Sequence, residues 1–229
     1  MQKKPSSTQR KVDLHALPGT AVQRYVPHVR IAILGSGVVG QALARGLAKH
    51  GHEVRIGTRK DQVDDLPVGT PSEVVKDADL VFLSVLGTAA VDLVTSIQDE
   101  LRGKVLIDTT NPLDFSSGGP SLFVGHSDSL GEQVQRAVPD TRVVKAYNTV
   151  GNANMVDPDL RGGPPTMFIG GDSEEAKSTV TTLLEATGWD VVDLGGRETS
   201  RYLEPICIAW VLHGIRTGTW NHALRLLRG

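Results

Sequence analysis

The sequence predicts an α/β protein with a doubly wound, Rossmann-type sheet that is mainly parallel, followed by a small C-terminal helical portion. Three observations predict this class. Short apolar runs alternate with helical patterns along most of the chain. A glycine-rich turn at positions 35–40 joins the first apolar run to the first helical pattern. Residues 198–229 hold no further strand pattern, and we expect two helices there, broken near Gly218.

The first β-α-β unit is expected over residues 31–60. Its opening run, Ile31 to Leu34, is apolar enough for a buried strand. A helical pattern then continues to about His50, and a second short strand is expected from Glu53 to Ile56. The unit has the length that a dinucleotide-binding β-α-β unit requires.

The turn inside this unit has the spacing G-x-G-x-x-G, with Ser36, Val38 and Val39 between its glycines. Gly35 allows the tight turn, Gly37 lets the backbone approach a pyrophosphate, and Gly40 lets the helix pack closely on the strand. The free N–H groups at the helix start favour phosphates. The spacing alone is a weak signal, but its position between a strand and a helix predicts a dinucleotide site.

The end of the second strand distinguishes between two cofactors. An NAD site wants an acidic residue there, whereas this chain has Thr58, Arg59 and Lys60. A guanidinium and a hydroxyl suit a 2′-phosphate, which predicts NADP. A solvated basic turn is the alternative, because Asp61 follows directly.

The middle of the chain predicts further strands and helices. Ser72 can cap a short helix that continues to Asp77, and the helix that begins at Thr88 has an apolar stripe that ends at Leu101. The expected elements here are strands at 79–85 and 104–108, a long loop at 109–126 and a helix at 127–138. A structureless loop of that length in a compact domain is usually functional.

The later elements are expected in the same alternation. Ser173 begins a helix that runs through Thr187, with two glutamates in its first turn. The other expected elements are strands at 142–147, 166–169 and 190–194, and a loop or short helix at 148–158.

The loops after the strands should line one crevice, because ligands of such sheets bind at the carboxyl ends of the strands. The later loops are residues 84–87, 109–112 and 148–152. The candidate cofactor-binding residues among them are Ser84, Val85, Leu86, Asn111, Pro112, Asn148, Thr149, Val150 and Asn152.

This set of residues is poor in acids and bases. It contains no Ser-His-Asp triad, Tyr-x-x-x-Lys pair or metal cluster, so we assign no catalytic side chain and no metal. Hydride transfer between two redox cofactors needs close, parallel rings and no acid or base of its own. His126 could reach the crevice from the long loop, while His213 and His222 are expected to be structural. Asp108 is expected to cap or brace a loop.

Composition excludes several classes of protein. Of 229 residues 39% are hydrophobic, but no run is long enough to span a membrane, and the first residues contain no secretory signal. The only cysteine, Cys207, excludes an internal disulfide and is expected to be buried. These features favour a cytoplasmic protein. We expect a flexible basic arm at 1–28 and an acidic NADP-binding domain at 29–229, which argues against nucleic acid as a partner.

The sequence resembles the NADPH-dependent coenzyme F420 reductases and is similar to the reductase domain of six-transmembrane metalloreductases. The matching stretches lie between about residues 30 and 228. They are IAILGSGVVG, IGTRK, DLVFLSV, KVLIDTTNPL, VVKAYNTV, FIGGD and RYLEPICIAW.

The resemblance implies a role for each matching position. Positions 36–39 would hold the pyrophosphate, Thr58 and Arg59 the 2′-phosphate, Val85 and Leu86 the adenosine–nicotinamide side, and residues 148–152 the segment where a deazaflavin stacks. Two positions depart from archaeal members, which have an aromatic residue at Gly87 and a histidine at Asn148.

Three functions remain open from the sequence. The first is hydride transfer between NADP(H) and coenzyme F420, and the second is flavin or ferric reduction with NADPH. The third is an NADPH-sensing module without turnover. Because the C-terminal helices Leu203 to Leu212 and Trp220 to Leu227 are apolar, a homodimer is expected.

Overall fold

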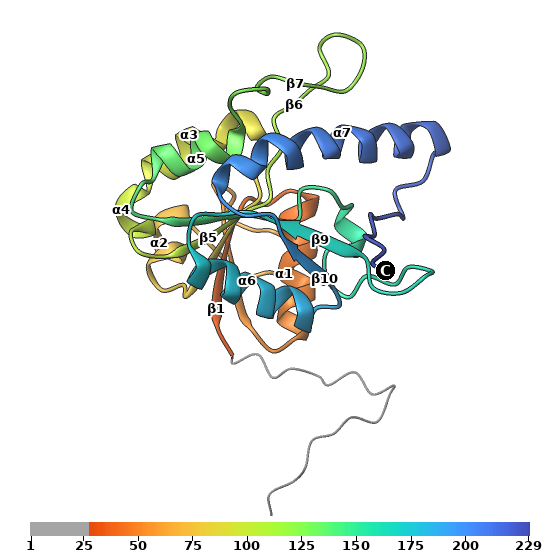
Figure 1. Cartoon of the computed structure of the whole chain (residues 1–229). Helices are drawn as coiled ribbons and strands as arrows, with labels where there is room; N and C mark the ends of the chain where they lie inside the picture. Colours follow the sequence, from red (N-terminus) through yellow and green to blue (C-terminus); the bar gives the residue numbers. More distant parts are fainter. Residues whose placement is uncertain (1–27) are drawn as a thin grey trace, which may run out of the picture.

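The computed structural model describes residues 28–229. The expected N-terminal arm therefore lies almost wholly outside the described residues. The described chain forms a layered α/β body, with one long helix across one edge of the sheet (Figure 1).

A parallel sheet of six strands forms the centre and confirms the predicted fold class. Its strand order is β3-β2-β1-β4-β5-β8. The chain thus adds β2 and β3 on one side of β1 and the later strands on the other, which makes the gap between β1 and β4 the switch point of the sheet. The central strands are buried on both faces, as their apolar runs predicted. The strands are β1 (Arg30–Leu34), β2 (Glu53–Gly57), β3 (Val68–Gly69), β4 (Leu80–Leu83), β5 (Val105–Asp108) and β8 (Arg142–Lys145).

Helices cover both faces of this sheet. Leu47 of α1 and Val180 of α6 pack in one apolar cluster with the sheet. Val94 of α3 and Val134 of α5 pack in a second cluster on the other face. The helices are α1 (Val38–Lys49), α2 (Pro71–Lys76), α3 (Gly87–Ser96), α4 (Gln98–Leu101), α5 (Leu130–Ala137) and α6 (Glu174–Ala186).

Two small sheets lie beside the main one. The parallel strands β9 (Thr166–Ile169) and β10 (Asp190–Asp193) join the end of β8 through backbone hydrogen bonds between Lys145 and Gly170. The predicted structureless loop at 109–126 instead contains the hairpin β6 (Leu113–Asp114) and β7 (Ser121–Leu122). Asp114 stabilises its turn by accepting hydrogen bonds from the backbone and hydroxyl of Ser116.

The helix α7 (Ser200–Thr217) runs along one side of the sheet (Figure 1), and its Glu204 side chain pairs with Lys145 at the end of β8. It ends at Gly218, whose left-handed conformation has φ of +69°. The prediction of a second C-terminal helix at 220–227 is wrong, because residues 219–229 contain no helix.

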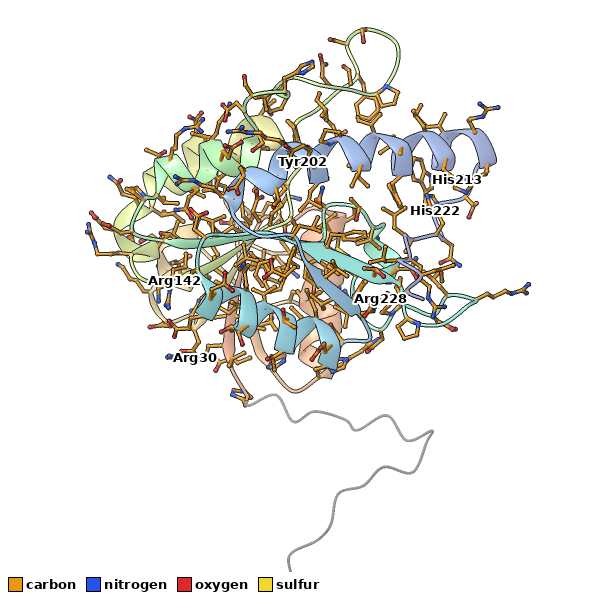
Figure 2. The ribbon with its side chains drawn as sticks, viewed as in Figure 1. Arg30, Arg142, Tyr202, His213, His222 and Arg228 are labelled. Carbon is orange, nitrogen blue, oxygen red and sulfur yellow. The ribbon has the colours of Figure 1, made fainter. Side chains whose placement is uncertain are left out.

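Tertiary contacts account for this extended ending. The Leu224 carbonyl accepts from the Thr166 amide at 2.9 Å, and the His222 carbonyl accepts from Trp210 Nε1 at 3.0 Å. The His222 ring also stacks on Trp210 with centroids 4.7 Å apart, and it meets His213 of α7 edge-on (Figure 2).

Helix boundaries also differ from the prediction at three places, and α5 begins at Leu130 rather than at 127 because Ser129 caps it. The expected helix from Thr88 to Leu101 is split into α3 and α4 at Ile97, whose φ of −129° is not helical. Thr70, not Ser72, caps α2, because Thr70 forms a capping box with Glu73 and Pro71 takes the first helical position. The Ser72 hydroxyl donates instead to Glu100. Two short 3₁₀ helices, η1 (Asn152–Asn154) and η2 (Arg197–Thr199), complete the described elements.

Candidate cofactor site

The glycine turn brings β1, α1 and β4 into very close contact. Gly35 has φ of +121°, and a Cβ placed there would lie 2.2 Å from the Ser84 carbonyl oxygen. A Cβ on Gly40 would lie 2.0 Å from the Gly35 carbonyl oxygen. Both positions therefore require glycine, one for the turn and one for the packing of helix on strand.

The start of α1 is open to an anion. Its N-cap residue, Gly37, is exposed and provides no side-chain cap, and the first turn holds no acidic residue. Gln41 donates its side-chain amide to the Ser36 carbonyl at 3.0 Å and so stabilises the turn from the helix side. Because the first amides of a helix lack intrahelical acceptors, this end suits a phosphate.

Thr58 joins the end of β2 to the glycine turn. Its hydroxyl donates to the Ser36 hydroxyl at 3.0 Å and accepts from the Lys60 amide at 3.2 Å. Arg59, between them, is exposed and has no ion-pair partner within residues 28–229. Thr58, whose hydroxyl bonds Ser36, and the exposed Arg59 are neighbours in the chain, and a hydroxyl and a guanidinium are groups that bind a phosphate monoester well.

A cavity of about 650 Å³ lies at the carboxyl ends of the strands, as expected for this topology. It is lined by residues from the glycine turn, Arg59, the ends of β4 and β5, the start of α3 and the hairpin. The lining residues are Gly35, Ser36, Gly37, Val38, Val39, Arg59, Ser84, Val85, Leu86, Gly87, Thr88, Ala89, Thr109, Thr110, Asn111, Leu113 and Phe115.

Sequence reasoning missed four of the lining residues. Thr88 and Ala89 lie on the first turn of α3, one step beyond the expected loop. Leu113 and Phe115 belong to the hairpin inside the long loop, whose length had indicated a functional segment. That length was the signal that could have identified them, although it does not select particular side chains.

The other candidates lie outside this cavity. Gly40 and Pro112 are buried behind its wall, Lys60 faces solvent, and Asn152 is exposed at the start of η1. Thr149 and Val150 are also buried, so the loop after β8 does not line the cavity directly.

Asn111 connects the cavity to that loop. Its side-chain amide donates to the Asn148 carbonyl at 2.8 Å, and its Oδ1 accepts from Asn148 Nδ2 at 3.1 Å. Asn148 Nδ2 also donates to the Leu203 carbonyl on α7. Asn148 Oδ1 is buried and has no hydrogen-bond partner among residues 28–229, which leaves an acceptor available behind the cavity wall.

The backbone is strained directly before Asn148. Tyr147 has φ of +61°, a conformation that a bulky residue seldom adopts, and its ring is fully buried between Phe82 and Trp189. The Tyr147 amide donates to Met167 Sδ. Residues strained in this way persist only where packing holds them against their preferred conformation, and they cluster at ligand sites.

The cavity wall carries little acid–base chemistry. Arg59 is its one ionisable lining residue within the described chain. His126 lines a separate hollow with Tyr202, so the structure does not bring it into the cavity. Cys207 is 3% exposed, as predicted, and burial raises the pKa of its thiol to about 11. No group of three or more metal-ligating side chains occurs in residues 28–229.

Asp108 braces the loop after β5, as the sequence predicted. Its Oδ1 accepts from the amide and the hydroxyl of Thr110 at 2.9 and 2.7 Å. The Thr109 hydroxyl donates to the Leu83 carbonyl at 2.9 Å. The wall formed by Thr109 and Thr110 is therefore held rigidly against the sheet.

Comparison with known proteins relates this site to one family. Residues 30–112, which hold the glycine turn, Arg59 and most of the cavity wall, match the family model "NADP oxidoreductase coenzyme F420-dependent". The F420-dependent NADP reductase of Methanothermobacter marburgensis is 30% identical over 222 residues, which cover 86% of this chain and 98% of that protein.

A candidate F420-dependent NADP reductase from Arthrobacter sp. FB24, whose crystal structure is known, is 36% identical with a TM-score of 0.83. The match covers 87% of this chain and 100% of that one. Metalloreductase STEAP3 of Rattus norvegicus is 31% identical over 183 residues, or 77% of this chain, but the match spans only 36% of that protein.

No helix among the described residues has the length and apolar character needed to cross a membrane. The archaeal and bacterial reductases, in contrast to STEAP3, are matched over nearly their full lengths. This chain belongs to the family of coenzyme F420-dependent NADP oxidoreductases.

Proposed function

We propose that this oxidoreductase transfers a hydride between NADP(H) and coenzyme F420. One observation carries the proposal: the cavity combines a helix start without a side-chain cap, an Arg59 with no ion-pair partner among residues 28–229, and walls that hold no other ionisable side chain of those residues. The names of the archaeal relatives, F420-dependent NADP reductases, support the same pair of cofactors.

The phosphates of NADP(H) fit one end of the cavity. The backbone of Ser36, Gly37, Val38 and Val39 would bind the pyrophosphate at the start of α1, where the chain offers amides and no competing side chain. Thr58 and Arg59 would bind the 2′-phosphate, and Lys60 would add a second positive charge from solvent. Gly35 and Gly40 would support pyrophosphate binding indirectly, because they keep the turn tight.

The nicotinamide fits the other end. Ser84, Val85 and Leu86 would contact it from the end of β4, and Asn111 from the end of β5. When bound, the dihydronicotinamide supplies a hydride to the deazaflavin, which also takes a proton from water. Asn148 would stabilise the wall by bonding Asn111, whereas Pro112, Thr149, Val150 and Asn152 do not line the cavity.

The acceptor ring fits the exposed apolar rim of the same cavity. Leu86 is 79% exposed and Phe115 is 56% exposed, although both line the cavity. Exposed large apolar groups at a cavity mouth suit a flat ring that must approach the nicotinamide and leave again. The side chains here do not transfer protons, so their work is to orient two rings and exclude water.

The test is direct mixing of the protein with NADPH and oxidised coenzyme F420. We expect the absorbance of both cofactors to fall together, one F420 reduced for each NADPH oxidised. A protein that binds NADPH but leaves the deazaflavin oxidised would contradict the proposal.

The similarity to metalloreductase STEAP3 supports a second candidate, NADPH-dependent reduction of a flavin or a ferric chelate. The same assay separates the two. We would assign the second function if free flavin or a ferric chelate were reduced and F420 were not. If the protein bound NADPH but reduced none of these acceptors, we would assign the third function, an NADPH-sensing module without turnover.

We also infer a homodimer in the cytoplasm. The helix α7 exposes Tyr202, Leu212 and Ile215 to extents of 67%, 43% and 53%, and such a run of apolar side chains favours a second copy as cover (Figure 2 labels Tyr202). Sedimentation of the full chain and of a Leu212→Glu, Ile215→Glu variant tests this. We expect a dimer for the first and a monomer for the second, and a monomeric wild type would contradict the inference.

A further inference from the structure

Two carboxyl side chains and one lysine are buried together behind the cavity wall. Lys145 Nζ lies 2.9 Å from Asp108 Oδ2 and 2.8 Å from Glu204 Oε1. The three residues are 1%, 0% and 1% exposed, in the order Lys145, Asp108 and Glu204. Asp108 and Lys145 are register partners at the ends of β5 and β8, whereas Glu204 comes from the first turns of α7.

Every oxygen of the two carboxylates has a partner. Glu204 accepts from the amides of Leu130 and Gly131, the first two residues of α5, at 3.0 and 2.9 Å. Asp108 accepts from Lys145 and, as described above, from Thr110. The Lys145 bonds are charge-assisted, and the helix start adds its own partial positive charge beside Glu204.

The buried cluster carries more negative than positive charge. It holds two carboxylates and one ammonium, so its formal charge is −1. Burial lowers the pKa of Lys145, but its two carboxylate partners more than offset this and leave the pKa raised. The start of α5 offsets only about half a unit of charge. A net negative charge therefore persists where water does not screen it.

The proposed function places the nicotinamide near this charge. Asp108 directly precedes Thr109 and Thr110, which line the cavity. Arg59 follows β2, on one side of the glycine turn, and β4 and β5 lie on the other side in the sheet. A dinucleotide whose pyrophosphate lies on the turn and whose 2′-phosphate meets Arg59 must extend toward β4 and β5.

We propose that the buried cluster of Lys145, Asp108 and Glu204 selects the oxidised form of the nicotinamide, because the oxidised ring is positively charged and the reduced ring is neutral. Glu204 and Asp108 thus influence the affinity for the nicotinamide through their charge, without contacting the ring. This inference rests on the proposed function and deepens it, since a site that favours the bound oxidised cofactor drives NADPH to donate its hydride.

The expected effect is measurable. Asp108 is one or two residues from the cavity wall, and Glu204 shares its Lys145 partner, so both charges lie on the order of 10 Å from a ring placed there. Removing one unit of charge at that distance, at an effective dielectric constant of about 20 to 40, changes an affinity by about fourfold to about fifteenfold. The affinity for NADP⁺ should change by this factor, whereas the affinity for NADPH, whose nicotinamide ring is neutral, should not.

The experiment measures binding of NADP⁺ and NADPH separately, by titration calorimetry and without any acceptor. Glu204→Gln keeps the side-chain size and removes the charge, whereas Glu204→Asp keeps the charge and changes the length. Ser129→Ala is the control for damage to α5, because Ser129 is the buried, uncharged N-cap of α5 and accepts from the Glu132 amide.

We expect Glu204→Gln to weaken NADP⁺ relative to NADPH by about fourfold to about fifteenfold. Glu204→Asp and Ser129→Ala, which leave the charge unchanged, should keep the ratio of the two dissociation constants within about twofold of wild type. Equal loss of both ligands in Glu204→Gln, or an equal shift of the ratio in Glu204→Asp, would show that Glu204 is only a structural contact.

If Glu204→Gln does not fold, Asp108→Asn, at the end of β5, removes the other carboxylate charge and is measured in the same way. The wild-type protein gives a check without any variant, since a preference of tenfold or more for NADPH over NADP⁺ would overturn the inference. Failure here leaves the proposed function intact as long as both forms bind, whereas a protein that binds neither form contradicts the proposed function itself.

Discussion

Replacing Arg59 by alanine should separate NADPH from NADH. A lost charge-assisted hydrogen bond costs about 1.5–3 kcal/mol where solvent is excluded. Arg59 is exposed, and Thr58 with its bonded Ser36 hydroxyl remains in the variant. We therefore expect a smaller loss, roughly 1–2 kcal/mol, which is about fivefold to about thirtyfold in the dissociation constant for NADPH.

The assay is fluorescence titration of wild type and Arg59→Ala with both cofactors. NADH lacks the 2′-phosphate, so its affinity should change by less than about twofold. Because the contact is exposed, the NADPH effect should shrink as salt is added. Lys60→Ala removes the same charge from the neighbouring position outside the cavity and should cost less. Equal losses for NADPH and NADH in Arg59→Ala would refute the assignment of Arg59 to the phosphate.

Three further outcomes follow from the geometry. Gly40→Ala should destabilise the fold by more than about 2 kcal/mol in urea unfolding, because its new Cβ would meet the Gly35 carbonyl; an unchanged midpoint would contradict the close packing. Cys207 should react with a thiol reagent only after denaturation, since its pKa is raised to about 11; rapid labelling of the native protein would contradict its burial. The hydrogen bond from Arg30 lowers the pKa of Asp79 to about 2. The pair should therefore stabilise the fold above about pH 4 and lose this effect as the pH falls toward about 2. The melting temperatures of wild type and Asp79→Asn should differ slightly at pH 7 and converge near pH 2, and a difference that persists there would count against the pair.

Local patterns sufficed to predict the first half of the fold. The apolar run before Gly35 and the helical period after Gly40 set β1 and α1 almost to the residue, because strand burial and helix periodicity are read directly from neighbouring positions. Ser173 was correctly expected to begin α6, and its hydroxyl accepts from the Ala176 amide. The cavity followed from topology, since strand ends of a parallel sheet share one edge.

Contacts between distant segments account for what local patterns did not predict. Residues 220–227 are apolar enough for a helix, yet hydrogen bonds to Thr166 and Trp210 hold them extended. The link between Asn111 and Asn148 joins residues 37 positions apart, so no spacing rule could have revealed it. The ionic partners of Lys145 come from β5 and α7 and were equally invisible.

The extended ending also protects the protein from association through its strands. An unpaired strand edge is a template for another chain, and β9 has one neighbour, β10, along its length. Its other edge is occupied at both ends, by the Leu224 carbonyl on Thr166 and by Lys145 on Gly170. Residues 219–229 therefore cover part of this edge and leave less of it open to another chain.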